Sequence, residues 1–368
     1  MLLALARLFP KAPIYTLVHQ PGSVHPEIEC HPIHTSFIQR LPYAPAHFRQ
    51  YLPLFPLAIE TFDLRHFDVV ISTSHCVAKG VRTYPCQRHV SYIHTPMRYL
   101  WDQQEHYLAS FPLPAISRPL GQLACWPLKA WDAASAYRPH RLLANSSFVK
   151  KRILEVWKRQ STVLYPPVDV EFFAEGATKE RHGFLVVSAL VPYKRVDLAV
   201  QLCSQRHLPL TVVGEGPLRA SLEKQAGPSV HFCSGLTRAE LRETYGLSEA
   251  LLFCGVEDFG IVPVEAMAAG CPVIALAAGG ALETVVSRHL HDSTGVFLSE
   301  PTLDSLSQAI DTFRLRQQQG WFAPAILQKH ARSFSNEHFI QGFLAILKEM
   351  NILSSDMASM PVSFEKIA

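Results

Sequence analysis

Two glutamates flank a short glycine-containing loop that could bind a phosphorylated ligand. Glu257 lies at the start of the loop, and Glu265 lies in the apolar stretch that follows it. Pro263 suits the first position of a helix and Gly270 the residue after its last turn, so the pattern predicts a helix that begins at Pro263 and ends just before Gly270. Free backbone N–H groups at the start of that helix would bind a phosphate. Glu265 could then accept hydrogen bonds from a ribose diol, and Glu257 from other hydroxyls of the ligand.

Short apolar runs on both sides of this helix predict strands of a parallel sheet. Leu251–Cys254 precedes the loop, Val273–Leu276 follows the helix, and Gly279-Gly280 then forms a turn into a further short helix. In an open parallel sheet, ligands bind beyond the carboxyl ends of the strands, and both loops would lie there. The alternative interpretation is that the two glutamates are solvated acids that the helix dipole stabilises.

The order of residues from Glu257 to Val285 closely resembles the donor-binding motif of the retaining glycosyltransferases of family 4. The resemblance implies an α/β protein with the GT-B fold, in which two Rossmann-like domains face each other across a cleft. It implies that Glu257 contacts hydroxyls of the donor sugar and that Glu265 holds the ribose of the nucleotide. The further donor-binding residues that it implies are Gly214, Gly216, Phe259, Gly260, Ile261, Val262 and Gly280.

A lysine near the start of the second half could meet the negative charge of a diphosphate. Lys194 follows the strand pattern Phe184–Ser188, and we expect it at the opening of a helix. The family pattern has an arginine five residues before this lysine, and both bind the leaving pyrophosphate; this chain has Ala189 there. Loss of a charged donor aimed at developing charge typically costs about 3 to 4 kcal/mol of transition-state stabilisation. Ala189 therefore indicates a slow or inactive enzyme.

A second group of polar residues follows the strand pattern Val90–His94. The run from His94 to Asp102 resembles the mannosyltransferase-like branch of family 4, whose members commonly use GDP-mannose. The resemblance implies that His94 lines the donor-sugar and acceptor side of the site, with Arg98 and Asp102 as candidates for acceptor contact. Read alone, a histidine at a strand end is more often a hydrogen-bonded structural residue. We assign His94, Glu257 and Lys194 to positioning and charge stabilisation.

A length of 368 residues favours two domains, because a single core stops growing at roughly 250 to 300 residues. Apolar strands alternate with helical stretches in both halves, as in parallel α/β domains. We expect an incomplete N-terminal acceptor-side domain over 1–165, a nucleotide-sugar domain over 166–334, a helix over 335–352 packing back toward the first domain, and a tail over 353–368. The other strands that we predict are Ile14–Val18, Val69–Ser72, Arg141–Ala144, Leu210–Val213 and Val230–Cys233.

The first ten residues differ from the family's pattern. They resemble the later part of its first helix, so we expect the first strand and its Gly-rich loop to be missing from this sequence, through an upstream start or a truncated form. A signal peptide is the competing interpretation, but Arg7 interrupts the apolar run and no small-residue cleavage site follows.

Composition limits the partners and cofactors. A net charge of +3 is too small to indicate nucleic acid binding. No apolar run reaches the roughly 18 residues of a membrane-spanning helix. The eight cysteines are scattered, which favours reduced thiols in a cytoplasm over a zinc site. No Asp-x-Asp pair occurs, so we expect no metal and no cofactor, with Lys194 and the helix N-terminus neutralising the leaving phosphates.

The sequence therefore predicts a retaining, metal-independent hexosyltransferase. We expect it to move mannose from a nucleotide-diphosphate sugar, GDP-mannose, to a glycan or lipid-linked acceptor in the synthesis of a cell-envelope polysaccharide such as lipopolysaccharide. The expected location is the cytoplasm, with peripheral contact at the inner face of the membrane. Two alternatives stay open: a degenerate relative that binds nucleotide sugar or a partner without turnover, and another GT-B-like enzyme such as an epimerase or phosphorylase.

Overall fold

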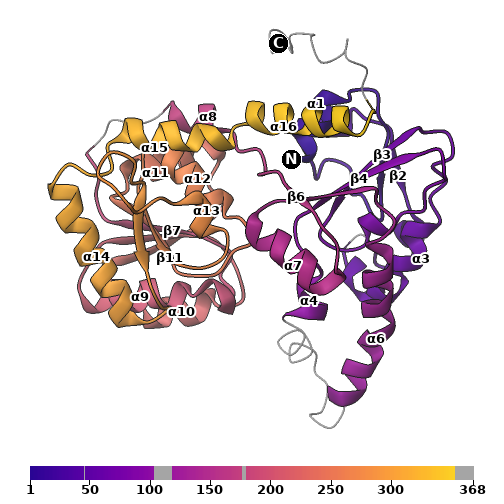
Figure 1. The fold of residues 1–368 in the computed structure, drawn as a ribbon. Coiled ribbons are helices and arrows are strands. Elements are labelled where there is room, and N and C mark those ends of the chain that lie inside the picture. The colour runs from indigo at the N-terminus through magenta and orange to yellow at the C-terminus, as the bar shows by residue number, and fades with distance from the viewer. Residues whose placement is uncertain (45, 103–117, 176–179, 353–368) are drawn as a thin grey trace. The chain divides into compact units, whose positions relative to one another are not determined.

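The computed structural model describes residues 1–44, 46–102, 118–175 and 180–352, with the backbone alone for 118–124 (Figure 1). The chain divides into two compact units. The first contains Met1–Leu164 and the C-terminal helix from Ile340 onward, and the second contains Tyr165–Phe339. The division lies one residue before the domain boundary expected from the sequence. The tail predicted over 353–368 lies outside the described residues.

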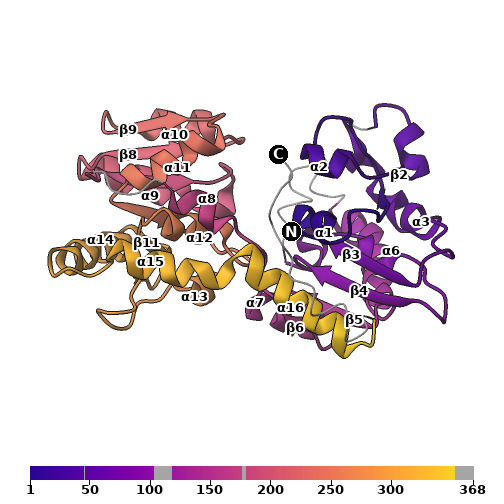
Figure 2. The ribbon, with the colours of Figure 1, turned by 90° about the horizontal axis from the view of Figure 1, so that it is seen from above.

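A six-stranded parallel sheet forms the centre of the second unit, in the order β12-β11-β10-β7-β8-β9 (Figure 2). Its strands are β7 (Phe184–Val187), β8 (Leu210–Val213), β9 (Val230–Cys233), β10 (Ala250–Phe253), β11 (Val273–Leu276) and β12 (Gly295–Leu298). β10 and β11 are buried along their whole length. Such unbroken apolar runs are typical of parallel strands that helices cover on both faces.

Helices cover this sheet on both sides and enclose one large apolar core. They are α8 (Val170–Ala174), α9 (Val196–Gln205), α10 (Arg219–Gln225), α11 (Arg238–Leu247), α12 (Ile261–Ala268), α13 (Ala281–Thr284), α14 (Leu303–Gln318) and α15 (Pro324–Ala331), with short 3-10 helices η5 (Pro192–Lys194) and η6 (Arg332–Phe334). α9 packs with α14, whereas α12 packs with α8, α11 and α15. In Figure 1 these two groups lie on opposite faces of the strands.

The first unit contains two parallel sheets. A pair of strands, β1 (Ile14–Thr16) and β2 (Ile33–Thr35), forms one sheet. The other has the order β3-β4-β5-β6 and consists of β3 (Val69–Ser74), β4 (Arg88–Ile93), β5 (Arg141–Ala144) and β6 (Thr162–Val163). Because all its pairs are parallel, the carboxyl ends of β3, β4 and β5 meet at one edge.

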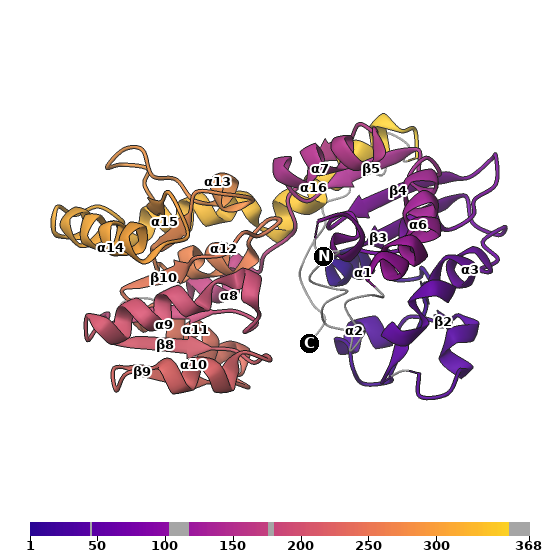
Figure 3. The same cartoon turned by 90° about the horizontal axis from the view of Figure 1, so that it is seen from below.

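Helices of very different lengths surround these sheets. They are α1 (Leu2–Leu8), α2 (Pro26–Glu29), α3 (Phe55–Glu60), α4 (Arg98–Trp101), α6 (Arg118–Ser135), α7 (Ser147–Trp157) and α16 (Asn336–Glu349), with 3-10 helices η1 (Phe37–Arg40), η2 (Phe48–Leu54) and η3 (Ala78–Gly80). Figure 3 shows α6 and α7 beside β3, β4 and β5. Among the described residues, none of the helices is both long and apolar enough to cross a membrane.

Most predicted strands occur within one or two residues of their expected ends. One of these small differences affects a predicted site residue. The strand predicted over Val90–His94 ends at Ile93, so His94 is the first residue beyond it. The strand predicted over Ile14–Val18 ends at Thr16 and does not join the four-stranded sheet. Three short strands, β2, β6 and β12, had no prediction, because two to four residues carry too little periodicity to stand out.

Candidate functional site

The carboxyl edge of the second unit's sheet brings two predicted site residues into direct contact. Lys194 ends the 3-10 helix that follows β7, and Glu257 lies in the loop after β10, the neighbouring strand. The ammonium of Lys194 forms an ion pair with Oε1 of Glu257, and both side chains are about one-fifth exposed. Lys194 precedes α9 instead of opening it as predicted, because Arg195 takes a left-handed conformation between the two helices.

The ion pair borders a hollow of only about 10 Å³, lined also by Ser188, Gly255 and the start of α9. That volume is about the size of one water molecule. Ala189 follows Ser188 and is exposed, and its own carbonyl oxygen accepts hydrogen bonds from Ser188 Oγ and the N–H of Val191. The position that the family's arginine would hold therefore has room for a longer side chain.

The predicted glycines let four loops approach one another closely, in two pairs. Gly214 has a φ of 155°, and a Cβ there would overlap the carbonyl oxygen of Ser188. A Cβ on Gly280 would overlap the backbone of Phe259, and the N–H of Gly280 donates to the carbonyl of Glu257 over 2.8 Å. Gly216 approaches the carbonyl of Leu190 in the same way. The contacts of Gly280 fix the loop that carries Glu257, and those of Gly214 and Gly216 fix the loop after β7.

The helix expected at Pro263 begins two residues earlier. α12 spans Ile261–Ala268, and Gly260, with a φ of 94°, precedes it. The sequence pattern favoured proline at the first helical position, but the left-handed glycine allows the turn to start at Ile261 and places Pro263 third. The free N–H groups of the first turn thus belong to Ile261 and Val262. Ile261 is exposed, and Val262 is half-buried. Glu265 consequently lies in the second turn and not in the first.

Phe259 does not present its ring to a ligand. Its side chain is buried and packs against the rings of Tyr165 and Phe334, each with its centroid 5.6 Å away. The residue can therefore contact a donor through its backbone alone. Its ring anchors the loop between Glu257 and α12 to the core.

Glu265 has an unusual electrostatic environment. Burial raises the pKa of its carboxyl to about 7, although a hydrogen bond from Tyr245 acts in the opposite direction. The hydroxyl of Tyr245, on α11, lies 3.1 Å from Oε2 of Glu265. Tyr245 is fully buried, and no feature of the sequence distinguished it as part of the site. A half-ionised carboxylate at neutral pH is available to a hydroxyl-bearing ligand.

In the first unit, His94 lies at the carboxyl end of β4, where its backbone N–H donates to the carbonyl of Ser74 over 2.8 Å. Burial, together with the neighbouring His75, lowers the pKa of His94 to about 4. The imidazole is therefore neutral at pH 7 and can position a group by hydrogen bonding. His75 directly follows β3 and was missed, because the sequence pattern placed the end of this strand at Ser72, two residues too early.

The acceptor-side candidates Arg98 and Asp102 lie at the two ends of α4. Asp102 forms an ion pair with the buried Arg152 of α7, which also donates to Thr95 Oγ1 over 2.7 Å. Arg152 thus ties the segment after His94 to α7. The hydroxyl of Ser146 caps the start of α7 by accepting a hydrogen bond from the N–H of Val149.

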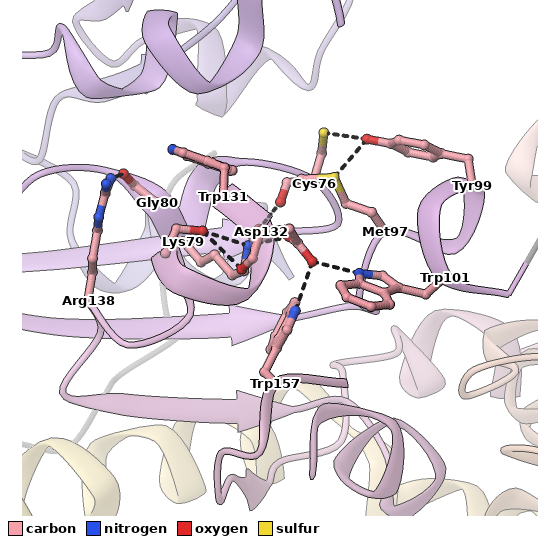
Figure 4. Close-up of polar contacts among 12 residues, drawn as sticks. Cys76, Lys79, Gly80, Met97, Tyr99, Trp101, Trp131, Asp132, Arg138 and Trp157 are labelled. Carbon is pink, nitrogen blue, oxygen red and sulfur yellow. Dashed lines mark hydrogen bonds and ion pairs between the residues drawn. The ribbon is translucent and has the colours of Figure 1, made fainter. Parts of the chain in front are cut away.

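A buried polar network holds the C-terminal end of α4 through Trp101 (Figure 4). Asp132 of α6 accepts hydrogen bonds from the indole N–H groups of Trp101 and Trp157, each over 2.8 Å, and pairs with Lys79 over 2.5 Å. Lys79 and Asp132 are both fully buried, and Lys79 also donates to Ser135. The network connects α4, α6, α7 and η3, so it fixes where Arg98 and Asp102 can lie.

No group of three or more histidine, cysteine or carboxylate side chains within the described residues could hold a metal ion.

Comparison with known proteins identifies the family of the second unit. Residues 168–320 match the family model of glycosyl transferases group 1. A GDP-Man:Man(3)GlcNAc(2)-PP-Dol alpha-1,2-mannosyltransferase of Xenopus laevis is 29% identical over 234 residues, which cover 55% of this chain and 47% of that protein. A GDP-mannose-dependent alpha-(1-6)-phosphatidylinositol monomannoside mannosyltransferase of Mycolicibacterium smegmatis is 30% identical over 176 residues, covering 40% of this chain and 45% of that one. The chain spans about half the length of the curated relatives it matches.

Solved structures agree on the fold over nearly the whole chain. HepE of Anabaena, in complex with UDP and glucose, has a TM-score of 0.67 at 18% identity and covers 94% of both chains. Sucrose-phosphate synthase of Thermosynechococcus elongatus has a TM-score of 0.70 at 17% identity, covering 95% of this chain and 92% of that one. The α/β fold class expected from the sequence is confirmed. Residues 168–320 therefore resemble the glycosyl transferases group 1, and the two sheet domains of the chain have the GT-B fold.

Proposed function

We propose that this chain transfers mannose from a nucleotide-diphosphate sugar to a glycan or lipid-linked acceptor, with retention at the anomeric carbon and without a metal ion. The observation that carries the proposal is the placement of Lys194 and Glu257 together at the carboxyl ends of β7 and β10, inside the region that matches the family. Mannose as the sugar is supported by the two mannosyltransferases among the relatives, whose names specify GDP-mannose.

In this proposal the donor is held by the second unit's loops. The diphosphate binds at the free N–H groups of Ile261 and Val262, where the dipole of the eight-residue helix α12 favours negative charge. Lys194 balances the charge that develops on the leaving phosphate. Glu265 accepts hydrogen bonds from the ribose hydroxyls, and Glu257 from hydroxyls of the sugar.

Transfer needs no protein nucleophile under this mechanism. The bond between the anomeric carbon and the diphosphate oxygen breaks, and the acceptor oxygen forms a bond to the same face of that carbon. The acceptor proton passes to the departing phosphate oxygen. His94, which is neutral at pH 7, acts as a hydrogen-bonding group on the acceptor side. Charge stabilisation by Lys194 is then the main contribution that the second unit makes to the rate.

The ion pair implies a step before chemistry. Lys194 cannot meet a diphosphate with its full charge while it is paired with Glu257, and the hollow beside the pair holds no more than about one water molecule. The donor must therefore separate the two side chains. Glu257 then becomes free to accept from the sugar, so the pair couples phosphate binding to sugar binding.

Peripheral contact with a lipid surface is part of the proposal. The stretch 30–59 contains no aspartate or glutamate, and it carries the exposed apolar side chains Tyr43, Phe48, Leu54 and Leu57. Its inner side packs into one apolar core cluster, so the exposed side chains project from an ordered layer. An apolar surface without acidic groups suits the boundary of a membrane with anionic headgroups.

A second candidate function is nucleotide-sugar binding without turnover. Ala189 supports it, because the second cation expected at the leaving pyrophosphate is missing and Arg195 is paired with Asp197 instead. Tight nucleotide binding without any transfer or hydrolysis would favour this candidate over the first.

The test is donor consumption and product analysis with the full chain. Purified protein is incubated with GDP-mannose or UDP-glucose and a lipid-linked glycan acceptor, with and without EDTA. We expect at least a tenfold preference for GDP-mannose, an α-linked product by NMR and no effect of EDTA. A β-linked product would contradict retention, and loss of activity in EDTA would contradict the metal-free mechanism.

A further inference from the structure

A basic groove lies at the amino-terminal edge of the first unit's four-stranded sheet, at the opposite end of β4 from His94. It has a volume of about 560 Å³. Arg88 opens β4, Arg141 opens β5 with His140 directly before it, and Gln160 precedes β6. Neighbouring parallel strands therefore present these side chains at one edge. Glu349, at the end of α16, lines the groove together with Arg141 at the start of β5 and Lys158 at the end of α7.

Several donors in the groove have no partner among the residues that the structure describes. The side chains of Arg88 and Lys158 make no hydrogen bond or ion pair there, and both are exposed. His140 accepts at Nδ1 from the backbone N–H of His89 over 3.1 Å, which leaves Nε2 as its donor. Lys158 is held in a left-handed conformation at the end of α7, with a φ of 55°. Its position is therefore set by the helix end and not by a protein carboxylate.

The remaining basic residues are fixed by the fold. Arg159 donates to the carbonyls of Ala136 and Pro139 over 2.8 and 3.1 Å, and its guanidinium lies 5.2 Å from the ring of Tyr137. Arg141 lies 3.6 Å from Glu349, the one carboxylate that lines the groove. A ligand would therefore meet two oriented guanidinium groups and two free cations.

The charge in the groove is not cancelled by its surroundings. Arg88, Arg141, Lys158 and Arg159 contribute four positive charges, and Glu349 one negative charge. The C-terminal ends of α7 and α16 lie here and add roughly half a negative charge each. The sum is about +2, which a doubly charged anion would balance. The two helix ends together offset only about one positive charge, so their attraction alone does not explain why four cations lie in the groove.

From this balance we propose that the groove binds a phosphate-bearing ligand, at a site separate from the donor loops of the second unit. A phosphate monoester or pyrophosphate carries about two negative charges and several acceptor oxygens, and arginine guanidinium groups match that geometry. The volume leaves space for a group larger than inorganic phosphate. The inference does not depend on the proposed transfer reaction.

The test uses pyrophosphate as the probe, in full-length protein that carries Lys194→Gln to weaken the donor loops. Calorimetry should show one binding site, and adding Arg88→Gln and Lys158→Gln should weaken it at least tenfold. The matched control adds Lys11→Gln and Lys224→Gln, two lysines outside the groove, and should leave the affinity within twofold. Circular dichroism checks that each variant is folded. The proposal would be overturned if the groove and control variants bound pyrophosphate equally well. It would also be overturned if the Lys194→Gln protein without groove substitutions did not bind pyrophosphate.

A second arm identifies the source of the phosphate. Co-sedimentation compares phosphatidylcholine vesicles with vesicles that also contain a phosphoinositide monophosphate. If the groove substitutions reduce both pyrophosphate binding and co-sedimentation with the phosphorylated vesicles, the ligand is a lipid headgroup. If they reduce pyrophosphate binding alone, it is a soluble phosphate compound.

Discussion

At the scale of single residues, the ligand-binding role proposed for Glu265 comes with a cost in the stability of the folded protein. Its carboxyl is half-protonated near pH 7 because burial disfavours the charged form, and among the described side chains the hydroxyl of Tyr245 alone is placed to hydrogen-bond its Oε2. A ribose diol would give the ionised form two further donors. A buried carboxylate with one protein partner is typical of groups that are completed by a ligand.

The first prediction concerns stability against pH. Between pH 4.5 and about 7 the unfolded chain has released the Glu265 proton while the folded protein retains it, so this residue lowers the free energy of unfolding as pH rises through that window. Glu265→Gln should therefore stabilise the ligand-free protein by roughly 2 to 3 kcal/mol at pH 8 and have little effect at pH 4.5. Urea unfolding at both pH values measures this, with the exposed Glu300→Gln as control; a gain that is independent of pH would contradict it.

The same substitution should weaken nucleotide binding. Nucleotide affinity of the unaltered protein should rise between pH 6 and 8 as the carboxyl ionises, and Glu265→Gln should remove that dependence and lower the affinity about tenfold at pH 8. Calorimetry with GDP and with UDP gives both quantities. An unchanged dissociation constant would rule out the ribose role.

A substitution at Ala189 should raise activity, whereas the one at Glu265 should lower nucleotide affinity. It is exposed beside the hollow that Lys194 borders, so Ala189→Arg should fit without repacking and add a second cation for the leaving phosphate. If charge stabilisation limits turnover, kcat should rise by one to two orders of magnitude, or about 1.4 to 2.7 kcal/mol of barrier. Steady-state rates with the preferred donor decide it, with Ala189→Gln as the uncharged control. Equal rates for the two variants would show that charge is not limiting.

At the scale of elements, α4 is held by the network around Asp132 (Figure 4). Asp132→Asn would leave the fully buried ammonium of Lys79 without its counter-charge, and breaking such a pair typically costs about 3 to 5 kcal/mol. The double variant Lys79→Met with Asp132→Asn should recover most of that loss, because an amide oxygen can still accept from the two indoles. Denaturant unfolding followed by tryptophan fluorescence measures both variants.

The matched control for the buried ion pair of Lys79 and Asp132 is an ion pair on the surface. Asp63→Asn removes the surface ion pair with Arg65 and should change stability by less than about 1 kcal/mol. A similar, small effect of Asp132→Asn would mean that the buried network does not hold α4 in place.

The sequence was informative about single elements and less so about contacts between them. Unbroken apolar runs such as Val273–Leu276 predict buried parallel strands, and these occur where expected. Lys194 and Glu257 were each selected from their own motif, but their ion pair depends on β7 and β10 being neighbours in the sheet, which spacing along the chain does not reveal. The start of α12 was predicted two residues late because Gly260 permits a turn that proline preference alone does not indicate.

Residues that act through tertiary packing had no sequence signal. Tyr245 reaches Glu265 from α11, and Arg152 reaches Thr95 and Asp102 from α7. His75 was missed for a different reason, since the strand before it runs two residues further than the predicted end at Ser72. The roles assigned to the donor and acceptor residues stay predictions.

At the scale of the molecule, the acid-free stretch 30–59 should govern attachment to lipid. Tyr43→Asn with Leu57→Gln removes the two most exposed apolar side chains of that stretch and should weaken binding to vesicles containing phosphatidylglycerol at least tenfold. The matched control, Leu154→Gln with Leu315→Gln, alters exposed leucines elsewhere and should have no effect. Vesicle co-sedimentation distinguishes the two, and equal binding by both variants would exclude this surface.

The most direct test of the central claim is sugar transfer by the full chain and by Glu257→Gln, with Glu300→Gln as control. With GDP-mannose and a lipid-linked glycan acceptor, the unaltered chain and the control should form an α-mannosylated product, and Glu257→Gln should lower kcat/KM by at least a hundredfold, or about 2.7 kcal/mol. Undiminished transfer by Glu257→Gln would contradict the account. So would an unaltered chain that shows no transfer, no hydrolysis and no nucleotide binding with any donor.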